Sequence, residues 1–309
     1  MIKYVIYGPT MIDDIQLPDG SIAHDIVGGG GPQAAFAAAI WSDEVGLMTR
    51  TGTDFPEALE PIIRGGGYDL QGWHRFAHIP TPHTIMAYDE KEIPSESNER
   101  WTWRTAFYAL INTPIEIPEP YQGAIMAHLV VDKPLDHVVQ SWFKAREDRQ
   151  ATISIEPIFD FHHWTNRDEM TALSREGDAI TPDWLAASNG AQSQDPLEVM
   201  RHWITTGPEM IAIRHGARGS YVWDRQHDEI WHVPICPVTV RDVTGAGNAY
   251  GGGMAMGWME TRDARMAGCY GTVSASFLVE HIGIPMMTET TRETAHRRLE
   301  KALEQARRL

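Results

Sequence analysis

From residue 123 onward, short apolar runs alternate with longer segments in which apolar residues recur every three to four positions. Apolar runs of about four to eight residues are typical of buried strands, and the longer periodic segments are typical of helices. The expected strands are 124–131, 152–155, 179–180, 210–213 and 221–223, and the expected helices are 135–149, 166–175, 197–204, 250–260, 264–281 and 290–309. Strands that alternate with helices predict a mostly parallel α/β sheet, covered on both faces, with ligands beyond the carboxyl ends of its strands.

The first part of the chain begins with elements of the same kind. An apolar strand at 4–7 ends at Gly8-Pro9, and a turn at 18–20 separates two short strands within 14–26. Four glycines at 28–31 precede Pro32 and an alanine-rich run, which predicts a helix whose start leaves the backbone open to a ligand. A strand at 45–50 and a helix at 55–64 follow, and the helix is stopped by the glycines at 65–67.

Residues 72–108 have a different texture, because aromatic residues appear there in short β-like runs separated by turn residues. One interpretation joins these strands to those of 14–26 in a small accessory sheet that acts as a lid. The other places them in the main sheet. In the run 101–104, Trp101 and Trp103 alternate with polar residues, which predicts a strand with both rings on one face. Such a face covers the substrate or a partner subunit, or it only packs within the lid. A homodimer through the lid is a further expectation.

Composition excludes several function classes. The 309 residues suit a single domain, 1–309, and the net charge of −16 argues against nucleic acid or an anionic membrane as a partner. Two cysteines are too few for a disulfide framework, and the sequence contains neither a signal peptide's apolar segment nor an apolar run of 18 residues. We therefore expect a cytoplasmic protein. An anionic ligand remains compatible with this charge, since backbone N–H groups can bind phosphate locally.

The glycine-rich stretch 242–253 is the strongest candidate for chemistry. A β-rich run at 230–240 precedes it and a helix follows, so its N–H groups and the positive end of a helix dipole point at one place, where oxyanions bind. The alternative is a tight strand-to-helix turn without a ligand. The chain contains no Gly-Lys-Ser/Thr, which excludes a P-loop, and Tyr250 stands where a dinucleotide fingerprint needs a third glycine.

Five motifs in order along the chain carry a resemblance to a known family. They are Gly8 with Asp13, Gly28–Ala35, Gly52-x-Asp54, Ile211–Gly219 and Asp242–Tyr250. The last resembles the signature Asp-Thr-x-Gly-Ala-Gly-Asp-x-Phe over nine positions. On these motifs the chain resembles the ribokinase-like (PfkB) carbohydrate and nucleoside kinases over nearly its whole length. The resemblance implies a three-layer αβα sandwich with a mostly parallel central sheet and a small β-sheet lid.

The resemblance also implies ATP- and Mg²⁺-dependent transfer of a phosphoryl group to a hydroxyl of a small sugar or nucleoside. It assigns the anion hole to Gly245, Ala246 and Gly247, whose amides would stabilise charge on the transferring group. Asn248 occupies the position of the catalytic base. The substrate site would comprise Asp13, Gly29, Gly30 and Gln33. The nucleotide site would comprise Gly216, Gly219, Asp242 and Thr244.

Several positions depart from the family pattern together, which indicates a divergent branch. Asn248 replaces the aspartate that acts as general base, and an amide cannot take a proton at neutral pH. Where the family has a magnesium-associated Asn-x-x-Glu, this chain has Asp183 and Ala186, so Asp183 is expected to hold Mg²⁺ through water. Gln33 replaces an asparagine, and Glu156 an aspartate. A histidine close to Asn248 in space is one replacement for the base. The competing hypothesis is a pseudokinase that binds a sugar or nucleotide in a regulatory role.

Overall fold

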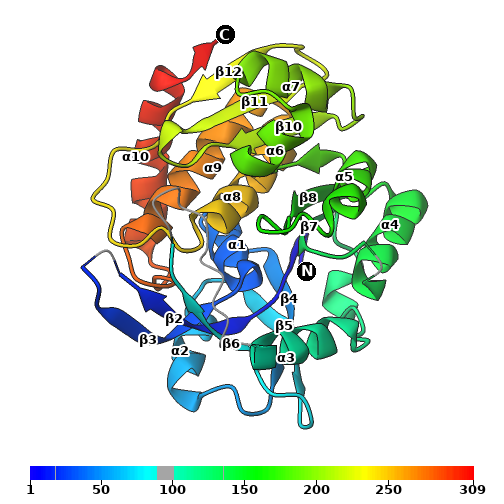
Figure 1. Cartoon of the computed structure of the whole chain (residues 1–309), viewed down its shortest axis with the longest axis vertical. Helices are drawn as coiled ribbons and strands as arrows, with labels where there is room; N and C mark the ends of the chain where they lie inside the picture. The colour runs from blue at the N-terminus through cyan, green and yellow to red at the C-terminus, as the bar shows by residue number, and fades with distance from the viewer. Residues whose placement is uncertain (18, 89–100, 135) are drawn as a thin grey trace.

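The structure is a computed structural model that describes residues 1–17, 19–88, 101–134 and 136–309, with the backbone alone at 101–103 and 149. Its main sheet has ten strands in the order β13-β12-β11-β10-β9-β8-β7-β1-β4-β5 (Figure 1). The strands from β5 to β10 in this order are parallel, and β10 to β13 pair antiparallel at one edge. The strands are β1 Tyr4–Tyr7, β4 Val45–Gly52, β5 Asp69–Phe76, β7 Met126–Val131, β8 Thr152–Pro157, β9 Ala179–Ile180, β10 Met210–Arg214, β11 Ser220–Asp224, β12 Ile230–Val233 and β13 Arg307–Arg308.

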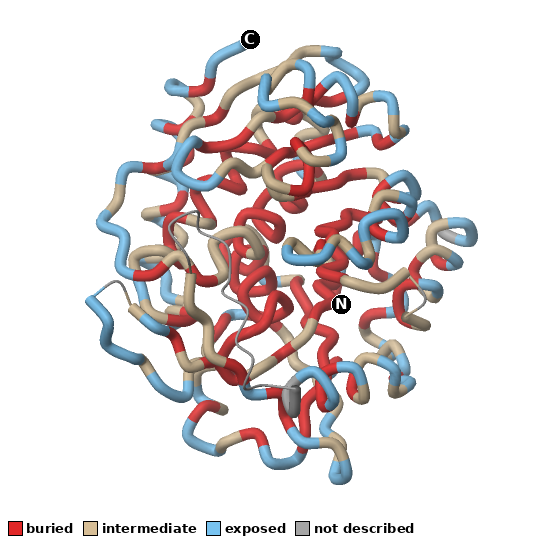
Figure 2. Tube along the Cα trace, in the orientation of Figure 1, coloured by how far each residue is buried: buried red, intermediate tan, exposed pale blue. Residues whose placement is uncertain are grey.

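Helices cover both faces of this sheet, so the predicted three-layer architecture is confirmed. The helices are α1 Gly30–Ala39, α2 Glu60–Arg64, α3 Trp101–Asn112, α4 His137–Arg149, α5 Arg167–Glu176, α6 Trp184–Ala191, α7 Pro196–Ile204, α8 Ala246–Thr261, α9 Ala264–Val279 and α10 Glu289–Gln305. Buried residues of α1, α8, α9 and α10 form one core, and those of α4 to α7 form the other. Along β10, Ala212 faces the first core and Ile211 the second, as the two-residue period of a strand requires. Figure 2 shows the buried segments running through the middle of the molecule.

A separate sheet of three strands lies beyond the carboxyl end of β1. It consists of β3 (Ile22–Gly28), β2 (Met11–Gln16) and β6 (His83–Met86), in that order. Only Gly8, Pro9 and Thr10 connect β1 to β2, so the sheet stays close to the edge where the main strands end (Figure 1). The strands predicted within 14–26 are present in this sheet, and its role as a lid stays a prediction. A homodimer through it stays a prediction.

The strands predicted within 72–108 divide between the two sheets, and one part of the prediction was wrong. β5 pairs with β4 in the main sheet and β6 pairs with β2 in the separate sheet, so each of the two interpretations holds for one strand. Residues 101–112 instead form the helix α3. In α3, Ala106, Phe107 and Leu110 are buried while Tyr108 is exposed, which is the three-to-four residue period of a helix. The alternation at 101–104 misled the prediction because four residues are too few to separate the two periods. Residues 89–100 lie outside the described part of the chain.

Two further boundaries differ from expectation. The strand expected at 230–240 ends at Val233, and an extended segment leads on to α8. The N–H of Arg241 donates to the carbonyl of Val279 at 2.7 Å, so the end of α9 holds this segment. Helix α6 covers 184–191, where no helix was expected. No helix in the described ranges is long and apolar enough to cross a membrane.

Candidate active site

Three segments meet at the carboxyl edge of the sheet, and each brings residues that the sequence singled out. β2 carries Asp13, the β3–α1 junction carries Gly29 to Gln33, and the segment entering α8 carries Asp242 to Asn248. Figure 1 shows β2, α1 and α8 converging on the same part of the molecule. The fold therefore brings together the expected substrate residues and the expected anion hole. Their roles remain predictions.

Asp13 is a buried carboxylate that lies against the β3–α1 junction. Only 2% of the residue is exposed, and a Cβ on Gly28 would lie 1.7 Å from its Oδ2, so glycine is required there. The N–H of Gly29 donates to the carboxylate, while Oδ1 has no hydrogen-bond partner in the described part of the chain. Burial, together with the charges of Asp242 and Asp14, raises the pKa of Asp13 to about 7.

Asp242 shapes the entry into α8. Its Oδ1 accepts hydrogen bonds from the N–H of Thr244 at 3.0 Å and from the Thr244 hydroxyl at 2.8 Å, which closes a tight turn. Its Oδ2 is buried without a partner among the described residues. The side chain of Thr244 also hydrogen-bonds with Tyr88, and burial raises the pKa of this tyrosine, helped by the charges of Asp242 and Asp13. Tyr88 was missed, because an isolated tyrosine between turn residues carries no motif.

The first turn of α8 presents unpaired N–H groups. Gly245 is the N-cap with φ +82°, and a Cβ there would lie 2.3 Å from the Gln33 amide carbon, so the position requires glycine twice over. Within the described chain, the amides of Gly245, Gly247 and Asn248 have no hydrogen-bond acceptor. The N–H of Ala246 instead donates to the carbonyl of Val243 at 3.2 Å. Three free amides at the positive end of a 16-residue helix form a site for an oxyanion.

A partly buried arginine lies behind this site. Nη1 of Arg214, at the end of β10, would be 2.9 Å from a Cβ on Gly247, so the guanidinium contacts the first turn of α8. The same nitrogen donates to Oε1 of Glu156, which is 3% exposed. Burial alone would raise the pKa of Glu156, but Arg214 and His128 outweigh it and hold the pKa below its usual value. Arg214 was also missed, although it stands directly before the glycine turn of the fourth motif.

The structure records no hydrogen bond between Asn248 and any histidine in the ranges it describes. His128 lies instead beside Glu156, with 3.6 Å between Nε2 and Oε2, and its Nδ1 bonds the hydroxyl of Ser154 at 2.9 Å. His24 lies on the lid sheet, where its Nδ1 is 3.2 Å from Oδ2 of Asp14. These contacts give both histidines structural partners. A histidine base next to Asn248 therefore has no support among the contacts recorded.

Asp183 has other partners than a metal ion. It is the N-cap of α6, where its Oδ1 accepts from the N–H of Leu185 at 2.7 Å. Burial raises its pKa, against the positive charge of Arg214 nearby. Ala186 is buried and offers no ligand atom. A single carboxylate engaged in this way does not by itself form a magnesium site, since Mg²⁺ is usually held by one or two carboxylates together with phosphate oxygens and water.

The predicted nucleotide turn follows β10 directly. It is a 3-10 turn at Gly216–Arg218, with φ +50° at Gly216 and +88° at Gly219. His215 stacks on Trp184 with ring centroids 3.9 Å apart and an interplanar angle of 7°. Burial and the charge of Arg218 lower the pKa of His215 to about 4, so this ring is neutral at physiological pH. Through Arg214, the turn is joined to the first turn of α8.

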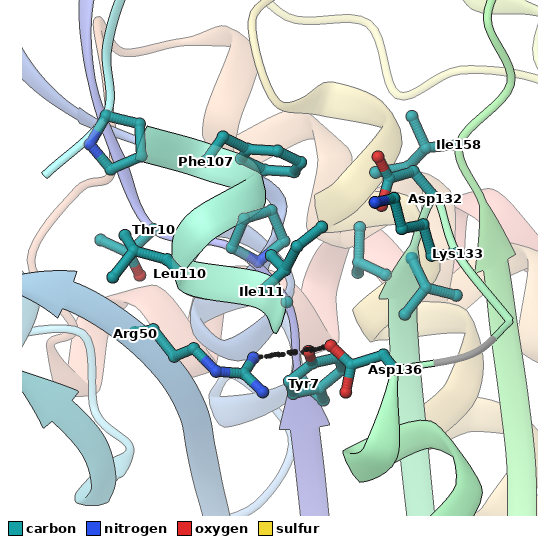
Figure 3. Close-up of a pocket in the computed structure, with 15 residues that line it drawn as sticks. Tyr7, Thr10, Arg50, Phe107, Leu110, Ile111, Asp132, Lys133, Asp136 and Ile158 are labelled. Carbon is teal, nitrogen blue, oxygen red and sulfur yellow. Dashed lines mark hydrogen bonds and ion pairs between the residues drawn. The ribbon is translucent and has the colours of Figure 1, made fainter. Parts of the chain in front are cut away.

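A pocket opens beside Asn248, and the sequence did not predict it. The residues between β1 and β2, the end of β7 and the inner face of α3 line it (Figure 3). Gly30 links the pocket to the site, because a Cβ there would lie 2.5 Å from Cγ1 of Val130 and 3.1 Å from Oδ1 of Asn248. Asp132 lines the pocket, and burial raises its pKa to about 6 although Lys133 opposes the shift.

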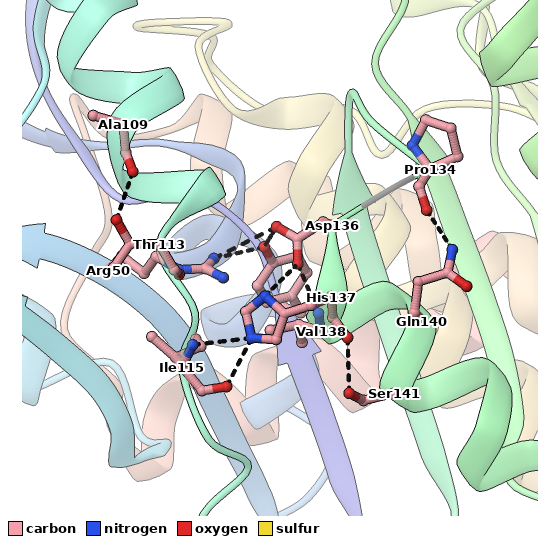
Figure 4. Close-up of polar contacts among 11 residues, drawn as sticks. Arg50, Ala109, Thr113, Ile115, Pro134, Asp136, His137, Val138, Gln140 and Ser141 are labelled. Atoms are coloured by element: carbon pink, nitrogen blue, oxygen red, sulfur yellow. Dashed lines mark hydrogen bonds and ion pairs between the residues drawn. The ribbon is translucent and has the colours of Figure 1, made fainter.

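A network of buried charges supports the wall of this pocket (Figure 4). Nη1 of Arg50 donates to the hydroxyl of Tyr7 at 2.6 Å, and that hydroxyl donates to Oδ2 of Asp136. Arg50 and Asp136 also form an ion pair at 3.7 Å. Oδ1 of Asp136 caps α4 by accepting from the N–H of Val138 at 2.8 Å. The network thus fixes β1, β4 and α4 to one another beneath the pocket.

Comparisons with known proteins identify the family of this chain. Residues 121–290 match the model of the pfkB family carbohydrate kinases. A cytidine kinase of Thermococcus kodakarensis is 25% identical over 85% of this chain and 90% of its own. A nucleoside kinase of Methanothermobacter thermautotrophicus is 28% identical over 95% of this chain and 91% of its own. The structure of an E. coli protein described as a putative ribokinase II, in complex with ATP and Mg²⁺, superimposes on this chain with a TM-score of 0.73. The match covers 96% of this chain and 100% of the E. coli protein at 17% identity, so it shows a shared fold. Together with the glycine turn, the anion site and the lid, the family match shows that this chain belongs to the pfkB family of carbohydrate kinases.

Proposed function

We propose that this protein transfers the γ-phosphoryl group of ATP to a hydroxyl of a small sugar or nucleoside. The observation that carries the proposal is the meeting of an anion site and a buried carboxylate. Free amides at the start of α8 lie with the guanidinium of Arg214 behind them, and Asp13 lies across the junction of β3 and α1. Phosphoryl transfer requires such an arrangement, because a hydroxyl must be held in line with a group that gathers negative charge.

Each residue has a distinct task in this account. The amides of Gly245, Gly247 and Asn248 donate to oxygens of the transferring group, and Arg214 adds a fixed positive charge in a buried setting. Asp13 accepts hydrogen bonds from substrate hydroxyls. Magnesium would be held largely by the phosphates of ATP, with Asp183 reached through water at most.

The pocket near Asn248 is narrow: its volume is about 20 Å³, which is room for roughly one water molecule and not for a sugar ring. Phe107, Leu110 and Ile111 of α3 line one side of it, and Asp132 and Lys133 lie at its edge (Figure 3). The pocket therefore does not indicate which acceptor binds. The similarity to a cytidine kinase and to a nucleoside kinase supports nucleosides as the first substrates to test.

The experiment that tests the proposal measures ADP formation with a panel of nucleosides and sugars, for the wild type and for Asn248→Asp. We expect turnover by the wild type with at least one acceptor. The pseudokinase hypothesis, which Asn248 and Ala186 favour, predicts a different result. In that case a ligand raises the melting temperature of both forms while neither form turns over.

A further inference from the structure

Phosphoryl transfer leaves a proton on the attacking hydroxyl that some group must accept, and Asn248 does not offer one. Its Nδ2 donates to Oε1 of Gln33 at 2.6 Å, so the amide is fixed as part of a side-chain pair. An amide oxygen is too weak a base to take a proton at neutral pH. The following inference rests on the proposed function and asks which residue of this chain replaces the base.

Asp13 is a buried carboxylate with one oxygen left available beside the residues expected to bind substrate. The residue is 2% exposed, the N–H of Gly29 holds its carboxylate in place, and its Oδ1 has no partner within the described residues. A buried oxygen without a hydrogen bond is costly, so an atom in this state is expected to have a partner when the site is filled. A substrate hydroxyl would be that partner.

The position of Asp13 also fits a hydroxyl directed at the anion site. Gly28 contacts Asp13, whereas Gly30, two residues further on, contacts Asn248. The backbone that carries these glycines therefore connects the carboxylate to the first turn of α8. A substrate lying along 28–30 would place a hydroxyl between Oδ1 of Asp13 and the free amides of Gly247 and Asn248.

Asp242 and Glu156, two other carboxylates near the site, each also leave one buried oxygen without a partner among the described residues, but their other oxygen is bonded within the site. Asp132, a third, lines the pocket at the end of β7. Oδ1 of Asp242 accepts two hydrogen bonds from Thr244, which fixes the turn into α8. Glu156 is ion-paired with Arg214. Its Oε2 lies beside Gly251, which follows the last free amide, that of Asn248, in the helix α8. A carboxylate paired with a buried guanidinium is a weak base, because protonation would leave the cation without its partner.

We propose that Asp13 is the general base of this protein, taking the proton that the family's aspartate takes at position 248. The substrate oxygen forms a bond to the γ-phosphorus of ATP while the bond from that phosphorus to the bridging oxygen of ADP breaks. The hydroxyl proton moves to Oδ1 of Asp13. The proton leaves to solvent after the phosphorylated product and ADP have dissociated, which restores the carboxylate.

The charges around Asp13 favour this role. Asp242 faces it from the segment before α8, Asp14 is its neighbour on β2, and Tyr88 approaches from beyond β6. Burial and the charges of Asp242 and Asp14 raise the pKa of Asp13 to about 7, which is close to the value at which a base works best at neutral pH. A carboxylate that only binds substrate would not benefit from these neighbours, because the negative charges of Asp242 and Asp14 repel its own charge.

The test is the pH dependence of kcat/KM for the wild type, Asp13→Asn, Asn248→Asp and the double variant, with substrate affinity measured by titration calorimetry. We expect a wild-type acid limb near pH 7, and a loss of about 10²–10⁴ in kcat for Asp13→Asn while the substrate still binds. The double variant should regain activity, with its acid limb at lower pH, because the carboxylate then lies at position 248. Asp14→Asn is the matched control: it should retain the wild-type kcat at high pH, while its acid limb moves to lower pH because one of the charges that raise the pKa of Asp13 is gone.

The opposite results overturn the inference. One such result is that Asp13→Asn keeps a kcat within about threefold of the wild type, with the acid side of its pH profile unchanged. Another is that the only change in Asp13→Asn is a higher KM. If the double variant stays as inactive as Asp13→Asn, a carboxylate at position 248 cannot replace Asp13, and the base assignment is wrong. If no form transfers phosphate to any acceptor at any pH, the proposed function itself fails and the inference fails with it.

Discussion

Asn248 and Gln33 form a hydrogen bond, from Nδ2 to Oε1, with 2.6 Å between the two atoms. Gln33 is on the first turn of α1 and Asn248 on the first turn of α8, so the bond joins the two helix starts at the site. The resemblance described in the sequence analysis implies a shorter amide at position 33 and a carboxylate at position 248. The two residues at which the sequence departs from that pattern therefore contact each other.

This pairing predicts non-additive effects of substitution. Gln33→Asn should lose the bond because its side chain is one methylene shorter, and kcat/KM should fall. In the Asn248→Asp background, Gln33→Asn should cost less. A double-mutant cycle in kcat/KM should give a coupling of about 1 kcal/mol. Effects that simply add would show that the two side chains act independently.

The charge behind the anion site leads to a second prediction. Arg214→Gln keeps a polar side chain but removes the cation that contacts the first turn of α8. We expect kcat to fall by about 10²–10³, the range found when one group that stabilises transition-state charge is removed. Steady-state kinetics would measure it, with Arg218→Gln as the control, since Arg218 lies in the following turn and its residue is exposed. Equal losses in both variants would contradict a specific role for Arg214.

The raised pKa of Asp13 predicts a gain in stability when its charge is removed. The pKa is about 7 in the folded protein against 3.8 ordinarily, so between these values the native state binds the proton more tightly and the free energy of unfolding falls as pH rises. Asp13→Asn should therefore be more stable than the wild type at pH 8. One pKa unit corresponds to about 1.4 kcal/mol, so the gain is on the order of a few kcal/mol. It should shrink towards pH 4.5.

Urea denaturation at pH 8 and pH 4.5 measures this difference, and Asp14→Asn serves as a control of opposite sign. Burial acts to raise the pKa of Asp14, but hydrogen bonds from Asp25, His24 and His83 outweigh it and lower the pKa. Its charge therefore stabilises the fold above its ordinary pKa, and this contribution is lost as pH falls through the folded value. Asp14→Asn should be less stable than the wild type at pH 8. If both variants raised, or both lowered, the free energy of unfolding at pH 8, the opposite pKa shifts of Asp13 and Asp14 would be contradicted.

Close packing of α1 and α8 predicts a large cost for one added methyl group. A Cβ on Gly252 would lie 2.1 Å from the carbonyl oxygen of Ala34, and backbone cannot move aside as a flexible side chain can. Gly252→Ala should lower the free energy of unfolding by about 1–3 kcal/mol. Gly190→Ala is the control, since its Cβ would meet only Cζ2 of Trp203 at 3.6 Å, and alanine in a helix gains about 0.5–1 kcal/mol over glycine. Thermal unfolding should shift in opposite directions, and a neutral Gly252→Ala would show that the helices can separate.

The regular part of the fold followed from the sequence because its strands are short and mostly apolar and its helices are periodic. From β7 to α10 the expected elements agree with the structure, apart from α6 and the length of β12. The short helix α6 was hidden because its eight residues contain a run of small side chains with little amphipathic contrast. The helix α3 was hidden because aromatic residues at its start alternated with polar ones over only four positions.

The candidate site was predictable where backbone conformation demands particular residues. Gly245 and Gly29 have φ of +82° and +88°, so the sequence had to place glycine there and the motifs became visible. Arg214, Tyr88 and Asp132 left no such signature, because their roles come from neighbours distant in sequence. Arg214 becomes part of the site only because β10 ends beside the start of α8. Such neighbours follow from the topology of the sheet and not from local spacing.

The most direct test of the central claim is whether the γ-phosphoryl group of ATP reaches an acceptor. Purified wild-type protein would be incubated with γ-labelled ATP, Mg²⁺ and each member of a panel of nucleosides and sugars, and labelled phosphoester would be measured beside Arg214→Gln. The account predicts labelled product from at least one acceptor with the wild type and a strongly reduced yield with Arg214→Gln. Absence of labelled product from every acceptor, for the wild type and for Asn248→Asp alike, while a ligand still raises the melting temperature, would contradict it.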